Sequence, residues 1–346
     1  MKKIALLLLF VLTGMSMRAQ MMPDSTVQFV AYWNVGDKYQ YSFESISKEV
    51  DAQGDTTIVK ESLEIAELEV IAKTEDSYQL KMTTIEKTDN DPQSQIINKI
   101  LKENGADIPI LFSTNNLGAL TSLDNIPELS AAFAKAAEPI AMEILKAQGM
   151  SEEELKDFKG FDIQGFIKGI VQQIADPALI QQSILDYIGR LFFFHGGRLE
   201  IDHTYSFEEP LNFIIPGMNE QLTAKTNFWV DGELTDDLSA ICRTFTSANI
   251  GNETVMSAIG TVSDFTMEYM DTTASAKAEV NAVIKEMLSD KEVNISWEQY
   301  STTEIHLNTG WPLRHYQDKY VKGGESEEAN SNEKIESLYI EIILSE

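Results

Sequence analysis

Hydrophobic and polar residues alternate with a period of two over much of the first third of the chain, which is typical of half-buried strands. The alternation covers residues 38–47, 56–73 and 78–84, and a turn cluster rich in Asp and Gly separates the first two segments. Strands that follow one another so closely favour antiparallel pairing. The pattern therefore predicts a β-meander over residues 27–90.

The segment 56–73 changes the parity of its apolar positions near its middle. Leu63 and Ile65 lie at odd positions, whereas the apolar set continues at even positions from Leu68 onward. One extra residue near Ala66-Glu67 would form a β-bulge and keep a single apolar face toward the core. A short helix is the alternative, because the segment is rich in Glu, and the strand is preferred.

Residues 92–192 show helical spacing instead of alternation, apart from one predicted hairpin over 108–123. Gly105 is placed to end the first helix, and Pro139 should kink or divide the Ala-rich third. The predicted helices are one ending at Gly105, 127–148, one starting from a capping box at 151–154, 162–175 and 177–192.

Strand patterns return after residue 197. Leu199 to Phe207 alternate as one strand, and Lys322–Glu333 has the Gly, Ser and Glu content of a mobile loop. Further strands are predicted over 222–230, 240–247, 293–307, 312–321 and 335–344, and helices over 253–269 and 274–288. The predicted fold is α+β: a curved, half-barrel-like antiparallel sheet with a helical layer and a large helical insertion.

The first 19 residues have the composition of a secretory signal peptide. Lys2 and Lys3 precede an apolar run from Ile4 to Leu12, and Ala19 is a small residue at the expected cleavage point. The run is shorter than the ~20 residues that a membrane span needs, and no cysteine follows it to accept a lipid anchor. We therefore expect an exported protein, periplasmic or extracellular, whose residues 20–346 form a single α+β domain. Its parts are a β part (27–90), a mainly helical insertion (92–192) and a β-rich part (198–346).

The charge is strongly negative, with 27 basic and 55 acidic residues giving −28. Cleavage after Ala19 would remove Lys2, Lys3 and Arg18 and leave 24 basic residues, so the mature charge is −31. Such a chain repels nucleic acid and anionic lipid surfaces. No nucleic-acid partner is therefore expected. No membrane span is expected either, because no second segment approaches 18 consecutive apolar residues.

No sequence motif points to a metal, a cofactor or a catalytic nucleophile. The histidines match no zinc-binding spacing, and Cys242, the single cysteine, has the apolar neighbours of a buried residue. We expect no metal, no cofactor and a protein that is not an enzyme. A hydrolase acting on glycans or peptides is the third-ranked alternative, because any two of the many carboxylates could act as a pair.

Aromatic residues in or beside the predicted strands are the candidates for a site. A curved sheet covered by helices can enclose an apolar cavity that holds a lipid or another apolar ligand on its concave face. The alternative is an ordinary filled core in an envelope-structural or protein-interaction module. The candidate cavity-lining residues are Tyr39, Tyr41, Phe43, Trp229, Trp297 and Tyr300.

Three short Asp-Ser/Thr motifs are also potential sites of O-glycosylation in exported bacterial proteins. They are Asp24-Ser25-Thr26, Asp55-Thr56-Thr57 and Asp271-Thr272-Thr273.

Three segments carry a resemblance to known proteins: Trp33–Tyr41 (WNVGDKYQY), Asn116–Gly118 (NLG) and Thr309–Arg314 (TGWPLR). Their order resembles that of exported Bacteroidetes proteins of unknown function. The meander and late hairpin also resemble, more distantly, the curved half-barrel of LolA/LolB-type lipoprotein carriers. The first resemblance implies export, and the second implies a lipid-binding concave face. Neither supplies catalytic residues.

Overall fold

The computed structural model describes residues 24–51, 53–147, 163–211, 222–255, 257, 260–261, 294–324 and 332–343. The signal peptide, the capping-box helix at 151–154, the helix over 274–288 and the motif at Asp271 lie outside these residues. Of the helix expected over 253–269, the described residues are helical.

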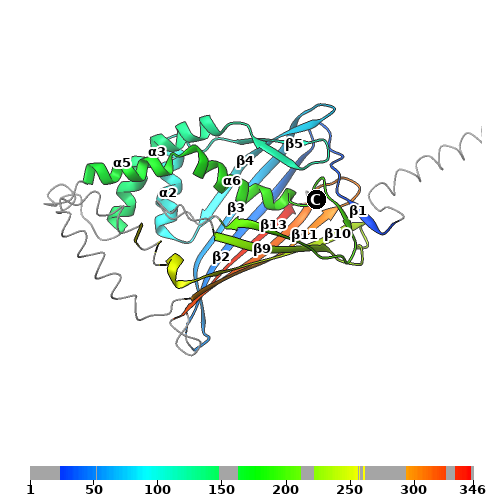
Figure 1. Ribbon diagram of the computed structural model, residues 1–346. Helices are drawn as coiled ribbons and strands as arrows, with labels where there is room; N and C mark the ends of the chain where they lie inside the picture. Colours follow the sequence, from blue (N-terminus) through cyan, green and yellow to red (C-terminus); the bar gives the residue numbers. More distant parts are fainter. Residues whose placement is uncertain are drawn as a thin grey trace, which may run out of the picture.

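The main structure is one curved antiparallel sheet with the order β6-β5-β4-β3-β2-β13-β12-β11-β10-β9-β8 (Figure 1). Strand β13 pairs with β2, so the last strand of the described chain lies in the middle of the sheet, beside the first strand of that sheet. This confirms the predicted α+β fold. The strands are β2 Lys38–Val50, β3 Thr56–Lys73, β4 Ser77–Asp89, β5 Ile110–Asn115, β6 Leu120–Leu123, β8 Tyr205–Leu211, β9 Leu222–Val230, β10 Ser239–Ile250, β11 Asn294–His306, β12 Pro312–Gly324 and β13 Asn332–Ile343.

Helix α6 lies across the sheet, whereas α2, α3 and α5 gather beyond one end of it (Figure 1). Pro139 lies inside α3, which continues through it without the expected division. Within the described chain, no helix has both the length and the apolar character that crossing a membrane requires. The helices are α2 Pro92–Glu103, α3 Ile126–Ala147, α5 Ile163–Ile174 and α6 Pro177–Phe192.

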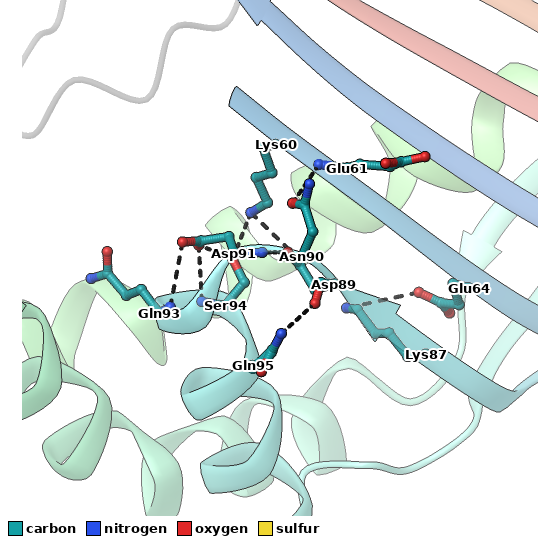
Figure 2. Close-up of polar contacts among 10 residues, drawn as sticks. All are labelled: Lys60, Glu61, Glu64, Lys87, Asp89, Asn90, Asp91, Gln93, Ser94 and Gln95. Atoms are coloured by element: carbon teal, nitrogen blue, oxygen red, sulfur yellow. Dashed lines mark hydrogen bonds and ion pairs between the residues drawn. The ribbon is translucent and has the colours of Figure 1, made fainter. Parts of the chain in front are cut away.

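Helix α2 begins where β4 ends because a polar cluster fixes its first turn (Figure 2). The Asp91 carboxylate accepts hydrogen bonds from the backbone N–H groups of Gln93 and Ser94, at 3.4 and 3.0 Å. Lys60 of β3 donates to Ser94 Oγ at 2.7 Å and forms an ion pair with Asp89 at 3.8 Å. The N-cap thus holds the helix against the sheet.

The bulge expected in β3 near Ala66-Glu67 is wrong, because the extra residue at this point belongs to the partner strand β4. The register with β4 shifts between Ile65 and Ala66. Ile85 of β4 has no counterpart in β3, so the alternation of β3 continues: Ala66, Leu68 and Val70 lie buried on the concave face, and Leu63, at the other parity, is 38% exposed.

The concave face of β2–β5 is filled by its own side chains and by α6. Tyr41 and Phe43 pack there with Ile188 and Phe192 of the helix, and the remaining void is only about 10 Å³. Tyr41 also donates a hydrogen bond from its hydroxyl to the Pro312 carbonyl at 2.9 Å. This half of the sheet is a close-packed core.

The β11–β12 hairpin turns at Gly310, as the TGWP segment predicts. Gly310 has φ +74°, and a Cβ atom there would collide with the carbonyl oxygen of Val30. The ring of His195 donates from Nε2 to the Gly310 carbonyl at 2.6 Å. The following residue, Trp311, stacks on Trp33 with ring centroids 4.7 Å apart.

Two further predictions, one of a strand and one of a loop, need correction. The segment Leu199–Phe207 is not one strand, because Asp202 adopts φ +59° and breaks it. The strand β7 (Arg198–Glu200) pairs with β1 (Thr26–Gln28) in a separate two-stranded sheet. His203, expected on the apolar side of a strand, is instead exposed between β7 and β8.

The second correction concerns the loop predicted over Lys322–Glu333. Strands β12 and β13 extend into its two ends, where Lys322 pairs with Glu333 in the antiparallel register, and residues 325–331 lie outside the described residues. Charged residues at the ends of strands face solvent, as they do in a loop. The polar composition of this segment therefore did not distinguish strand ends from a loop.

Candidate ligand-binding pocket

A pocket of about 450 Å³ lies between α6 and the concave face of β8–β12. Its helix side comes from α6 and the residues directly after it, including Leu185, Arg190 and Phe193. Its sheet side comes from alternate residues of five strands, so it occupies the half of the concave face that the core leaves open.

The sheet side of the pocket is polar because three strands each place polar residues at every second position. Side chains at i and i+2 of a strand share a face, and residues paired in register lie side by side. Thr244, Ser301 and Gln317 form one row across β10, β11 and β12. A second row contains Thr246, Gln299 and Lys319.

Hydroxyl groups on this floor bond to one another. Thr244 Oγ1 and Ser301 Oγ lie 2.5 Å apart, and Thr226 Oγ1 and Thr246 Oγ1 lie 2.8 Å apart. Thr226 also donates to the carboxylate of Glu209 on the edge strand β8. These groups can bind a ligand only through their remaining hydrogen-bonding capacity.

Two polar atoms in the pocket wall have no hydrogen-bond partner among the described residues: His315 Nε2 and Gln317 Oε1. Both residues are almost fully buried, at 2% and 3% exposure. An unsatisfied buried polar group costs about 1–3 kcal/mol. A ligand that bonded to them would recover part of this cost.

His315 is neutral at pH 7. Burial is the main cause that lowers its pKa to about 3, and the positive charge of Arg190 lowers it further, whereas the neighbouring polar side chain of Gln317 acts in the opposite direction. The imidazole can therefore donate or accept a hydrogen bond from Nε2, but it carries no charge to the site.

The two cations of the pocket differ in their partners. Lys319 forms an ion pair with Glu336 at 2.7 Å, and Lys334 contacts the same carboxylate at 2.8 Å. Burial alone would raise the pKa of Glu336, but these two lysines outweigh it and lower the pKa to about 2. The guanidinium of Arg190 has no ion pair with any described residue.

An apolar wall faces this polar floor. Phe193 is 44% exposed, although it packs against Phe228 and Phe207 with ring centroids 5.7 and 6.4 Å away. Leu185 of α6 and Trp297 of β11 also line the pocket. The site therefore combines hydrogen-bonding and apolar surfaces.

Of the six aromatic residues predicted to line a cavity, Trp297 lines this pocket. Tyr39, Tyr41 and Phe43 belong to the core under α6, where Phe43 stacks on Tyr187 at 4.8 Å between centroids. The structure thus brings these three together with one another but not with Trp297.

Trp229 and Tyr300 lie on the opposite, convex face. Tyr300 alternates with Ser301 and Gln299, is 46% exposed and packs on Phe245 at 4.6 Å. Trp229 pairs in register with Arg243, one residue before the inward-facing Thr244.

The polar residues of the pocket were missed, although the sequence carries a signal for them. Thr244 and Thr246 repeat at intervals of two, as do Gln299, Ser301 and Thr303. Runs of this kind inside strands that pair on both sides indicate a polar patch on one face. Arg190 has no such signal, because its place depends on how α6 packs over the sheet.

Other chemical groups do not extend the site. Among the described residues, no three His, Cys, Asp or Glu side chains gather in a metal-binding arrangement. Cys242 is fully buried, as expected, and burial raises the pKa of its thiol, so the thiolate nucleophile is disfavoured.

Comparisons with known proteins give only distant structural neighbours. No family model matches the chain, and no curated protein sequence matches it. A structure of lipovitellin, titled for its lipid–protein interactions, is similar with TM-score 0.38 and 8% identity, covering 90% of this chain. The chain spans only 25% of the lipovitellin chain.

Two outer-membrane proteins are also similar at low scores. An outer membrane channel from Pseudomonas putida F1 has TM-score 0.19 and 7% identity, with coverage of 90% of this chain and 97% of that one. A loop-deletion mutant of OmpT, an outer membrane protein of Vibrio cholerae, has TM-score 0.21 and 8% identity, with coverage of 89% and 100%. At such scores neither fold nor function transfers to this chain.

Proposed function

We propose that this protein is a binding protein that holds one small amphipathic molecule in the pocket between α6 and β8–β12. One observation carries the proposal: a pocket of about 450 Å³ whose wall contains the buried, unpartnered atoms His315 Nε2 and Gln317 Oε1. The volume lies within the range of ~300–1,000 Å³ that is usual for small-molecule sites.

The polar floor decides what kind of ligand fits. A purely apolar molecule would cover the hydroxyl, amide and imidazole groups of the floor without bonding to them, which is unfavourable. A lipid-like molecule with a polar head suits both surfaces, because Phe193, Leu185 and Trp297 supply apolar contacts for its tail. We therefore narrow the lipid or apolar ligand expected from the sequence to a molecule with a polar head and an apolar tail.

Carriage of such a molecule through an aqueous compartment fits the other proposals made from the sequence. The predicted signal peptide supports a place outside the cytoplasm, and the resemblance to LolA/LolB-type carriers supports ligand binding on a concave face. A source in Bacteroidetes and glycosylation at Asp24-Ser25-Thr26 and Asp55-Thr56-Thr57 likewise remain proposals.

The alternative, an interaction module with a filled core, is favoured only by the β2–β5 half. There the void under α6 is about 10 Å³. The β8–β12 half has the larger pocket, so we prefer a binding function.

The test is equilibrium binding of a neutral probe, N-phenyl-1-naphthylamine, to the full chain, with displacement by decanol. Two variants on neighbouring positions of β11 separate the two faces. Ser301→Phe adds bulk on the pocket side, because Ser301 lines it. Thr302→Phe adds the same bulk on the convex side and is the matched control.

We expect saturable binding of one probe per chain, displacement by decanol, and a loss of affinity of about 10-fold or more in Ser301→Phe alone. Circular dichroism checks that both variants are folded. Absence of saturable binding to the unmodified protein, or equal binding by the two folded variants, would contradict the proposal.

A further inference from the structure

We propose that Arg190 makes the pocket selective for an anionic head group, so that the ligand class is an apolar chain ending in a carboxylate or phosphate. This inference rests on the proposed function and adds the charge and the attachment point of the ligand. The argument begins with the surroundings of the guanidinium.

Arg190 is a partly buried cation that forms no direct ion pair with a described residue. It lines the pocket from α6, and among the described residues its guanidinium forms no ion pair or hydrogen bond. Burial lowers the pKa of Arg190, while the charges of Asp186 and Glu336 oppose this. A desolvated and uncompensated charge is costly, and a bound anion would remove that cost.

The neighbouring carboxylates do not neutralise this cation by direct contact. Asp186 lies one turn earlier on α6 and acts on Arg190 through its charge, but it forms no ion pair with the guanidinium. Glu336 is bonded to Lys319 and Lys334. Glu209, the third carboxylate, accepts from Thr226 on the edge-strand side of the pocket.

The other groups near the cation can complete an oxyanion site. A guanidinium offers paired N–H donors that match the planar oxygens of a carboxylate and also fit phosphate. Arg190, His315 and Gln317 all line the pocket, and His315 and Gln317 share one face of β12. Neutral His315 and Gln317 can add hydrogen bonds without adding charge.

The chain as a whole does not attract anions. Its net charge of −28 disfavours them at long range, so selectivity for an anion has to arise inside the pocket. The negative net charge alone would favour a cationic ligand. Comparing the affinities of anionic, neutral and cationic head groups decides between a site selective for anions and one selective for cations.

The experiment compares four ligands with the same probe-displacement measurement: decanoate, decyl phosphate, decanol and decylammonium. Acetate serves as the head group without a tail. The variants are Arg190→Gln, Arg190→Lys and the control Arg314→Gln. Arg314 lies on the convex side of β12 and pairs there with Glu304 at 2.8 Å.

We expect decanoate or decyl phosphate to bind about 10-fold or more tightly than decanol, and decylammonium and acetate more weakly than either. Arg190→Gln should remove this preference of the anions over decanol, Arg190→Lys should keep part of it, and Arg314→Gln should keep it all. A preference for the phosphate over the carboxylate, or the reverse, identifies which head group the site takes.

Failure of the inference is distinct from failure of the proposed function. Equal affinity for decanol and both anions in the unmodified protein, or tighter binding of decylammonium, overturns anion selectivity while ligand binding stands. An anion preference that persists in Arg190→Gln overturns the role of Arg190. If none of the four decyl compounds binds, both proposals fail, and this result needs no variant to fold.

Discussion

Thr303 Oγ1 and His315 Nδ1 lie 2.9 Å apart across β11 and β12, in the wall of the pocket. This hydrogen bond fixes the imidazole ring and occupies Nδ1, which leaves Nε2 as the atom without a partner. Both side chains are almost fully buried, at 1% and 2% exposure. The pairing of β11 with β12 therefore sets which nitrogen of His315 remains available to a ligand in the pocket.

A double-mutant cycle measures this pair. Thr303→Val should lower the free energy of unfolding by about 1–3 kcal/mol, because Nδ1 loses its partner in a buried place. In a His315→Leu background the same change should cost close to zero, since no imidazole is left unsatisfied. Urea unfolding gives both values, with Thr302→Val as a control. Equal costs in the two backgrounds would show that the contact is not energetically coupled.

Stability should fall as the pH falls below neutral. Burial lowers the pKa of His195 to about 4 and of His315 to about 3, both below the ordinary value of 6.5. Below pH 6.5 the unfolded chain then binds more protons than the folded one, so acid favours unfolding. Between pH 7 and 5.5 the two residues together should remove about 2 kcal/mol from the free energy of unfolding.

Glu336 should not add to this loss between pH 7 and 5.5. Its pKa is lowered to about 2, so its contribution to the free energy of unfolding is lost only at lower pH. Urea unfolding at pH 7 and at pH 5.5 measures the loss of unfolding free energy in the unmodified protein and in two variants. His315→Gln should reduce it by about half, whereas His203→Gln, at an exposed position, should not change it. An unfolding free energy that does not change between pH 7 and 5.5 would show that the buried histidines are not neutral in the folded state.

Gly310 and Gly36 provide a matched test of the TGWP turn. Both have positive φ, at +74° and +93°, but only at Gly310 would a Cβ meet the backbone of the 30–31 segment. Gly36→Ala should cost about 1–2 kcal/mol for the left-handed conformation alone. Gly310→Ala should cost about 2–5 kcal/mol because a steric clash is added. Thermal or urea unfolding distinguishes them, and similar costs would show that the turn does not depend on this close approach.

Much of the fold could be predicted because it is encoded by local periodicity. The alternation over residues 38–47 and 78–84 predicted β2 and β4, and the spacing after Pro177 predicted α6. The parity change in β3 predicted a bulge wrongly, because Leu63 is an apolar residue on the exposed face of the strand. The break at Asp202 was missed because the residues on both sides of it keep the same alternation, while the positive φ of a single Asp leaves no pattern.

The candidate site was predicted less well, because aromatic residues were grouped without regard to the faces of the strands. Trp297 and Tyr300 differ in parity, so they point to opposite faces of β11, whereas Tyr39, Tyr41 and Phe43 share one parity and one core. Whether a concave face is filled or open depends on where α6 crosses the sheet. That crossing is a tertiary property without a local signal.

The most direct test of ligand binding is a crystal structure of the full chain grown with decanol and with decanoate. We expect one ligand molecule between α6 and β10–β12, with its tail against Phe193 and Trp297 and its head toward Arg190, His315 and Gln317. Ligand density confined to the convex face near Tyr300, or a pocket closed by its own side chains while the ligand binds elsewhere, would contradict the account.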